Sequence, residues 1–172
     1  MAAHPEHTIL PLPSFERPVK LALVVAPYYR AIAEALVAGA MATAARAGAA
    51  VERFDVPGAL EIPPAIALAD RMGRFDGFVA LGCIIRGETT HYDTVCNDSS
   101  RGLMLLGLGG RRSGTGSSRS RTWPRPRCAP IPRDRTRAAA RPAAALHLVA
   151  MARAIGATRR GVGFNAHLGT PG

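Results

Sequence analysis

Residues Gly77–Leu108, GFVALGCIIRGETTHYDTVCNDSSRGLMLLGL, contain three local patterns in succession. Gly77–Leu81 is a short apolar run closed by Gly82, which is typical of a strand buried on both faces in a parallel sheet. A polar loop follows from Arg86 to His91. The next stretch, Tyr92–Leu108, has helical periodicity. A strand, a loop and a helix in this order form half of a βαβ unit and predict an α/β fold.

The same alternation continues outward from this stretch. Upstream we expect a strand, a helix, a second strand and a second helix, at Val19–Ala26, Arg30–Ala47, Ala50–Val56 and Glu61–Met72. Downstream, Ala143–Ile155 has the pattern of an amphipathic helix. Strands that alternate with helices at this spacing favour parallel pairing with right-handed crossovers. The sequence therefore predicts a three-layer α/β/α sandwich around a parallel, flavodoxin-like sheet.

Length and composition indicate one globular domain. The chain has 172 residues, of which 48% are apolar, and no apolar run approaches the roughly 20 residues of a membrane span. The three cysteines have no metal-ligand spacing. We expect an N-terminal arm at 1–17, a domain at 18–156, a flexible tail at 157–172, and a cytoplasmic location.

The net charge of +10 is concentrated in one segment. Gly109–Arg141 holds ten of the 22 basic residues but one of the 12 acidic residues. It also lacks leucine, valine, phenylalanine and tyrosine and is rich in proline, glycine and serine. Neither a strand nor an amphipathic helix is expected there, so the fourth strand of the sheet should be disrupted.

Three interpretations of this basic segment compete. It could be a disordered basic linker, or an insert that binds nucleic acid, although Trp123 is its one aromatic residue. The third interpretation is a local reading-frame error between two compensating changes, near Gly109 and near Arg141. Back-translated with permitted codons and read two bases later, the chain from Arg111 yields AIGNGILTVENMAQ, which contains an apolar strand. The frame-error interpretation is favoured, because long structureless stretches are uncommon inside compact domains.

Two strings carry a resemblance to a known family: FDVPGALEIPPAIALA from Phe54 and ALGCIIRGETTHYDTVCNDSSRGLMLL from Ala80. They resemble lumazine synthases, whose typical forms are VPGAFEIP and LGxVIRGxTxHxDYVxxExxxGL. VVAPYY near the start and ALHLVAMA near the end extend the resemblance over most of the chain. The shifted frame adds GILTVEN, which is similar to the family's GVLTTEN and would place the fourth strand near Gly114–Arg119.

The resemblance implies an enzyme of riboflavin biosynthesis. Its members condense 5-amino-6-(D-ribitylamino)uracil with 3,4-dihydroxy-2-butanone 4-phosphate to 6,7-dimethyl-8-ribityllumazine, and they need no metal or organic cofactor. They form homopentamers, sometimes stacked into decamers or sixty-subunit shells. The implied partners are therefore small-molecule substrates and further copies of the chain, with no membrane and no nucleic acid.

Independently of the resemblance, the residues point to one site. Ligands of open parallel sheets bind outside the carboxyl ends of the strands, where Tyr28, Ala59–Glu61 and Cys83–His91 should converge. Amides at the start of a helix can bind an anion, and Gly87 permits the backbone such a loop needs. The alternatives are an ordinary capped turn at Thr89 or Thr90 and tyrosines that merely pack on the sheet.

The resemblance assigns a role to each position. His91 would transfer protons, which suits a side chain that titrates near neutrality. Glu88 and Thr89, with Gly87, would bind the phosphate, and Tyr28 would stack on the pyrimidine. The residues implied to line the ribityl chain and the pyrimidine edge are Ala59, Leu60, Glu61, Cys83, Ile84 and Ile85.

The basic segment puts part of this site in doubt. In lumazine synthases a neighbouring subunit supplies a residue from the fourth strand and an arginine that pairs with the phosphate. In the shifted frame the codon of that arginine straddles Cys128 and Ala129. Two alternatives therefore stay open. One is an impaired lumazine synthase-like protein that binds flavins or ribityl-pyrimidines, and the other is a basic protein that binds nucleic acid through Gly109–Arg141.

Overall fold

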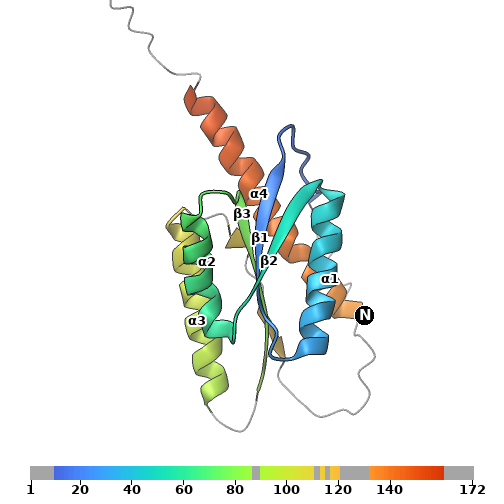
Figure 1. Ribbon diagram of the computed structural model, residues 1–172, viewed down its shortest axis with the longest axis vertical. Coiled ribbons are helices and arrows are strands. Elements are labelled where there is room, and N and C mark those ends of the chain that lie inside the picture. The colour runs from blue at the N-terminus through green and yellow to red at the C-terminus, as the bar shows by residue number, and fades with distance from the viewer. Residues whose placement is uncertain (1–9, 87–89, 111–112, 115–116, 121–131, 161–172) are drawn as a thin grey trace, which may run out of the picture.

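The structure, a computed structural model, describes residues 10–86, 90–110, 113–114, 117–120 and 132–160. Strands, helices and one short 3-10 helix alternate along it (Figure 1). In chain order the elements are β1 (Val19–Ala26), α1 (Arg30–Arg46), β2 (Ala49–Asp55), η1 (Ala59–Glu61), α2 (Ile62–Arg71), β3 (Gly77–Ile85), α3 (His91–Leu108), β4 (Ser113–Gly114), β5 (Ser117–Ser120) and α4 (Pro132–Arg160).

All strand pairs in the sheet are parallel. β1 lies between β2 and β3, and Val25 is opposite both Asp55 and Leu81. β4 and β5 pair with successive parts of β3 on its other side, so the order is β2-β1-β3 followed by β4 and β5. Parallel neighbours require crossover connections, and α1 and α2 supply them.

Helices cover both faces of the sheet. The odd-numbered residues of β1 from Val19 to Val25 pack with α1 and α4. The even-numbered residues from Ala22 to Ala26 pack with α2 and α3. Figure 1 shows α2 and α3 together on one side of the sheet and α1 on the other. The predicted three-layer sandwich is confirmed, and the continuous apolar run of β1 is explained by burial on both faces.

Most of the boundaries of the elements up to α3 agree with the sequence prediction to within one residue. β3 continues to Ile85 rather than ending at Leu81, because β5 pairs with its last four residues. The second helix begins at Ile62, after the separate 3-10 turn η1. Pro63 and Pro64 lie in its first turn as predicted, where proline removes no helical hydrogen bond.

The expectation that Gly109–Arg141 has no regular structure is wrong for part of the segment. β4 pairs with Phe78 and Val79, and β5 pairs with Gly82–Ile85, so two short strands take the place of one continuous fourth strand. α4 begins at Pro132 and continues through Pro142 to Arg160, longer at both ends than predicted. Backbone pairing requires no apolar side chain, and alanine and arginine favour helix without being amphipathic.

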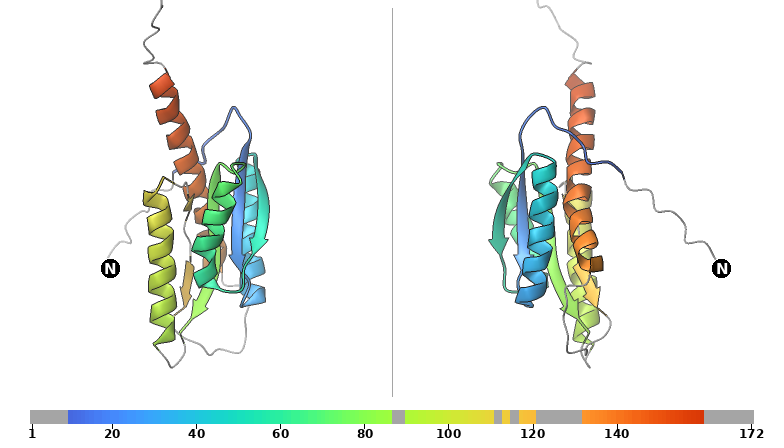
Figure 2. Two further views of the ribbon diagram at one scale, coloured as in Figure 1. Left: turned by 60° about the vertical axis from the view of Figure 1, so that its left-hand side comes forward. Right: turned by 90° about the vertical axis from the view of Figure 1, so that its right-hand side faces the viewer.

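The long helix α4 is fixed to the beginning of the sheet. The Arg153 guanidinium donates to the carbonyl oxygens of Arg17 (2.9 Å) and Pro18 (3.0 Å) and pairs with Asp76 (2.9 Å). Beyond this contact α4 extends past the body of the molecule (Figure 2). In the described part of the chain, neither this helix nor any other is long and apolar enough to cross a membrane.

Candidate functional site

The ends of β1 and β3 meet η1 around Gly82. A Cβ atom placed on Gly82 would lie 3.3 Å from Ile62 Cδ1, 3.8 Å from Ala26 Cβ and 3.9 Å from Ala59 Cβ. A larger side chain would separate these elements. The structure therefore brings together the starting points of the segments that carry Tyr28, Ala59–Glu61 and Cys83–Ile85.

Tyr28 projects from the loop between β1 and α1. Its side chain is 76% exposed, and its ring meets that of Tyr29 edge-on, with centroids 5.1 Å apart. Tyr29 is the N-cap residue of α1 and accepts a hydrogen bond from Ala33 N–H at its carbonyl (2.9 Å). The Tyr28 ring is thus open to a planar ligand, for which an aromatic face is a suitable partner.

Ala59, Leu60 and Glu61 make up η1, directly after the turn at Pro57-Gly58. Leu60 and Glu61 are exposed and Ala59 is half-buried. A Cβ atom on Gly58 would lie 2.8 Å from Glu61 Oε2, so the carboxylate folds back over the glycine. The turn thereby presents the backbone of η1 and the Glu61 carboxylate at the same edge of the sheet.

Cys83, Ile84 and Ile85 are the last residues of β3. β1 ends at Ala26, which is opposite Gly82, so these three residues project past it. On the other side they pair with Ser118, Arg119 and Ser120 of β5. All three are half-buried, as expected for residues that line a site with their backbone.

Of the loop between β3 and α3, the structure describes only the two ends. Gly87, Glu88 and Thr89, the predicted phosphate-binding residues, lie outside the described residues. Thr90 takes the N-cap position without a side-chain cap bond, so the predicted threonine cap is not formed there. His91 is the first residue of α3, and its side chain is exposed. The proton-transfer candidate therefore stands where the helix begins.

Arg86 links the two ends of this loop. Its guanidinium forms an ion pair with Asp93 in the first turn of α3 and lies over the Tyr92 ring, 4.4 Å from the centroid. The sequence patterns did not single out Arg86 for this role. The available signal was an arginine at a strand end followed by an acid in the first turn of the next helix, where an acid is favoured.

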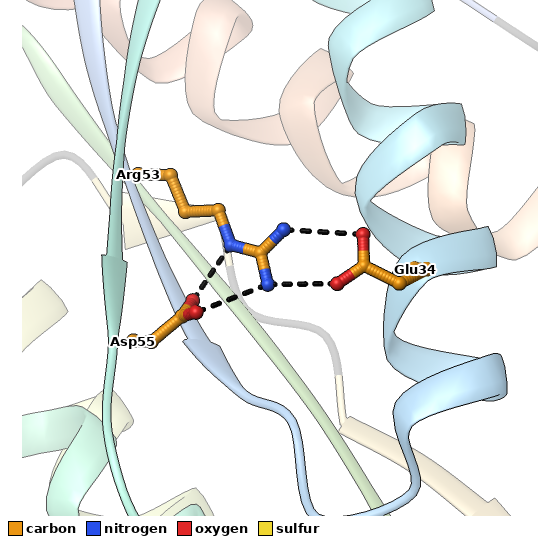
Figure 3. Close-up of polar contacts among 3 residues, drawn as sticks. All are labelled: Glu34, Arg53 and Asp55. Carbon is orange, nitrogen blue, oxygen red and sulfur yellow. Dashed lines mark hydrogen bonds and ion pairs between the residues drawn. The ribbon is translucent and has the colours of Figure 1, made fainter.

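A second polar cluster surrounds an open hollow of about 520 Å³ beside the β1–α1 loop. Its lining residues are Pro27, Arg30, Glu34, Arg53 and Asp55. Figure 3 shows Arg53 bonded on both sides, to Glu34 on α1 and to Asp55 on its own strand. The distances are 2.9 and 3.1 Å to the Glu34 carboxylate and 2.6 and 3.1 Å to the Asp55 carboxylate.

Within this cluster the hydrogen bonds between Arg53 and Glu34 stabilise the charged form of both side chains. The hydrogen bond from Arg53 holds the pKa of the Glu34 carboxyl below its usual range. The hydrogen bond to Glu34, followed by that to Asp55, raises the pKa of Arg53. The sequence analysis missed this cluster. Alternate residues of a strand share a face, so Arg53 and Asp55 could have been paired, but the contribution of Glu34 comes from tertiary structure.

The described residues hold no group of three histidine, cysteine, aspartate or glutamate side chains able to bind a metal ion. The groups with useful chemistry at the strand ends are the Tyr28 ring, the Glu61 carboxylate and the His91 imidazole. A ring to stack on, an acceptor for hydroxyls and a proton carrier suit an organic substrate with a planar ring.

Comparison with known proteins decides the family. The sequence profile of 6,7-dimethyl-8-ribityllumazine synthase matches residues 18–112, which is more than half of the chain. The chain belongs to the lumazine synthase family. A lumazine synthase from Jannaschia sp. (strain CCS1) is 47% identical over 164 residues, which cover 95% of this chain and 92% of the relative.

Other lumazine synthases match over a shorter range. The protein from Novosphingobium aromaticivorans is 50% identical over 97 residues, 56% of this chain and 70% of the relative. The protein from Bartonella henselae is 51% identical over 86 residues, 49% of this chain and 56% of the relative. The profile match ends at residue 112, near the start of the basic segment, whereas the Jannaschia alignment extends across the segment.

All of the candidate site residues lie within the range that matches the lumazine synthase profile. This range includes the β1–α1 loop, η1, the end of β3 and the start of α3. Membership of this family places the chain among the transferases of riboflavin biosynthesis.

Proposed function

We propose that this chain condenses 5-amino-6-(D-ribitylamino)uracil with 3,4-dihydroxy-2-butanone 4-phosphate, forming 6,7-dimethyl-8-ribityllumazine and releasing phosphate and water. The observation that carries the proposal is the meeting of β1, η1 and β3 at Gly82 within the range matched by the family profile. The carboxyl edge of a parallel sheet is the usual place for a small-molecule site.

The pyrimidine substrate would occupy the β1 and η1 side of this edge. Its ring stacks on the exposed Tyr28 side chain. The backbone of Cys83–Ile85, which projects past the end of β1, lines the edge of the ring. Ala59 and Leu60 contribute backbone groups, and the Glu61 carboxylate accepts hydrogen bonds from ribityl hydroxyls.

The phosphorylated substrate would lie at the start of α3. Gly87, Glu88 and Thr89 hold its phosphate, helped by the positive end of the α3 helix dipole. The Arg86–Asp93 pair and the contact of Arg86 with Tyr92 fix the two ends of this loop. The phosphate and its carbon chain are thereby held near the exposed imidazole of His91.

His91 would move protons through the reaction. The pyrimidine amine attacks the ketone and water leaves to form an imine. Phosphate is then eliminated, and the second amine closes the ring with loss of a second water. Each step needs a proton to be removed from nitrogen or carbon or delivered to a leaving oxygen, and an imidazole can do both near neutral pH. Holding the two substrates together supplies a large part of the rate.

We further propose that the active form is a homo-oligomer. One subunit supplies Tyr28, η1, the end of β3 and the start of α3, and a neighbour supplies a fourth-strand residue and a phosphate-binding arginine. This chain has two short strands, β4 and β5, at the position of that fourth strand. The observation favours a second candidate function, a lumazine synthase-like protein that binds ribityl-pyrimidines without converting them.

The test is a direct assay of the purified chain with both substrates, in parallel with the Jannaschia relative. Product is followed by its absorbance and phosphate by its release. Equal formation of lumazine and phosphate supports the proposed reaction. Calorimetric titration with 6,7-dimethyl-8-ribityllumazine separates the alternatives, because tight binding without turnover indicates the binding protein. Absence of both binding and turnover would refute the proposal.

A further inference from the structure

The start of α1 has few of the local features that normally stabilise a helix N-terminus. Its N-cap residue, Tyr29, makes no side-chain cap bond, and its first turn contains no acid. The first helical residue is Arg30, a cation placed at the positive end of the helix dipole. The orientation of this helix end, and of Tyr28 immediately before it, must therefore depend on tertiary contacts.

The Glu34–Arg53–Asp55 cluster supplies such a contact. Glu34 lies just beyond the first turn of α1, and Arg53 holds its carboxylate through both terminal nitrogens. The same guanidinium holds Asp55, the last residue of β2, in a second fork (Figure 3). A single exposed ion pair contributes little to stability. A guanidinium that makes two hydrogen bonds to each of two carboxylates, however, also fixes the orientation of all three side chains.

The Glu34–Arg53–Asp55 cluster, called the Arg53 clamp from here on, joins the two segments that would contact the pyrimidine substrate. On the α1 side it lies beside Pro27, which lines the same hollow and precedes Tyr28. On the β2 side Asp55 is followed by Val56, whose N–H donates to the Val25 carbonyl (2.8 Å), and by the turn into η1. A displacement of Asp55 relative to Glu34 would change the distance between Tyr28 and Ala59–Glu61.

We propose that Arg53 is a positioning residue that sets the width of the pyrimidine side of the site. The inference rests on the proposed function. The phosphate side is held separately, by the contacts of Arg86 with Asp93 and Tyr92. Loss of the Arg53 clamp should therefore weaken the use of one substrate and spare the other, which a general loss of stability would not do.

The experiment compares Arg53→Met with Arg74→Met. Arg74 also forms an exposed ion pair with β2, through Glu52, but it lies between α2 and β3 at the opposite end of the sheet. Methionine retains the apolar stem of each arginine and removes the charge. Arg53→Lys keeps the charge without the two forks. For each variant we would measure the melting temperature, KM for both substrates, and amide hydrogen exchange.

We expect Arg53→Met to raise KM for the ribitylaminouracil about tenfold, with KM for the butanone phosphate changed less than about twofold. Arg53→Lys should fall between Arg53→Met and the unmodified chain. Arg74→Met should leave both KM values unchanged at a similar loss of melting temperature. Hydrogen exchange at residues 28–34 and 56–61 should accelerate in Arg53→Met alone.

Equal changes in both KM values, or equal effects of Arg53→Met and Arg74→Met, would overturn the inference. A chain that forms no product argues against the proposed function instead. In that case amide hydrogen exchange tests the inference without any substrate. Faster exchange in Arg53→Met confined to residues 28–34 and 56–61 supports the positioning role, and unchanged exchange overturns it.

Discussion

At the scale of single residues, His91 is the group whose chemistry the proposed reaction most needs. It is exposed at the first position of α3, next to the loop that would hold the phosphate. His147 offers a matched comparison, because it is half-buried in α4 and its Nε2 has no hydrogen-bond partner within the described residues. The two histidines allow proton transfer to be separated from packing.

We predict that His91→Gln lowers kcat about a hundredfold and leaves both KM values nearly unchanged, since general acid–base catalysis contributes on this scale. Steady-state kinetics of the purified variant measure this. His147→Gln is the control and should retain the kcat of the unmodified chain. An unchanged kcat in His91→Gln would remove the imidazole from the mechanism.

At the scale of elements, α2 and α3 approach each other closely where Gly102 faces Pro63. A Cβ atom on Gly102 of α3 would lie 2.9 Å from Pro63 Cγ and 3.0 Å from Pro63 Cβ. Pro63 is buried in the first turn of α2, and its ring is rigid. The glycine is therefore required by packing between the two helices rather than by backbone conformation.

Gly102→Ala should destabilise the protein by about 1–3 kcal/mol, the usual cost of overpacking. Chemical denaturation measures the change in the free energy of unfolding. Gly156→Ala in α4 is the matched control, because nothing lies within 4 Å of the added methyl group, and it should be neutral or stabilising. A neutral Gly102→Ala would mean that α2 and α3 can separate freely.

The acids that connect β2 to its surroundings predict an acid-dependent loss of stability. A hydrogen bond from Arg53 lowers the pKa of Glu34, whose other charged neighbours are Asp55 and Arg30. A hydrogen bond from Lys20, with the charge of Arg74, lowers the pKa of Glu52. A lowered pKa in the folded state stabilises the fold above the pKa of the unfolded chain, and this stabilisation is lost as pH falls.

The melting temperature should therefore fall as pH decreases from about 5 to about 3. Thermal unfolding at several pH values measures it. In the double variant Glu34→Gln with Glu52→Gln the fall should be shallower, because these carboxyls can no longer take up protons. An equally steep fall in the double variant would assign the acid sensitivity to other groups.

At the scale of the whole molecule, the sheet is continuous on one side of β3 and interrupted on the other. β1 pairs with β3 without a break from Leu21 to Ala26, whereas β4 pairs with Phe78 and Val79 and the separate strand β5 pairs with Gly82–Ile85. The family profile match also ends here, at residue 112. Both observations are consistent with our proposal that Gly109–Arg141 is encoded in a shifted frame.

We predict that the nucleotide sequence across this segment encodes, in the neighbouring frame, a strand similar to GILTVEN. A chain with the frame restored should melt at least about 5 °C higher, since a continuous strand buries more apolar surface, and it should assemble into larger oligomers. Sequencing, thermal unfolding and sedimentation measure these outcomes. A neighbouring frame interrupted by stop codons would refute the proposal and favour a basic linker.

The sequence alone was sufficient to predict the layers and the sheet edge at which the candidate site residues of the described segments lie. Strong apolar runs such as Val19–Ala26 define buried strands locally, and loops that follow parallel strands must emerge at one edge. The short strands β4 and β5 escaped prediction, because backbone pairing with β3 leaves no apolar pattern in the chain. The Glu34 half of the Arg53 clamp also escaped prediction, since Glu34 reaches the guanidinium that holds Asp55 only when α1 packs beside β2. Local chemistry determined which residues could act, and long-range packing decided which of them are held together.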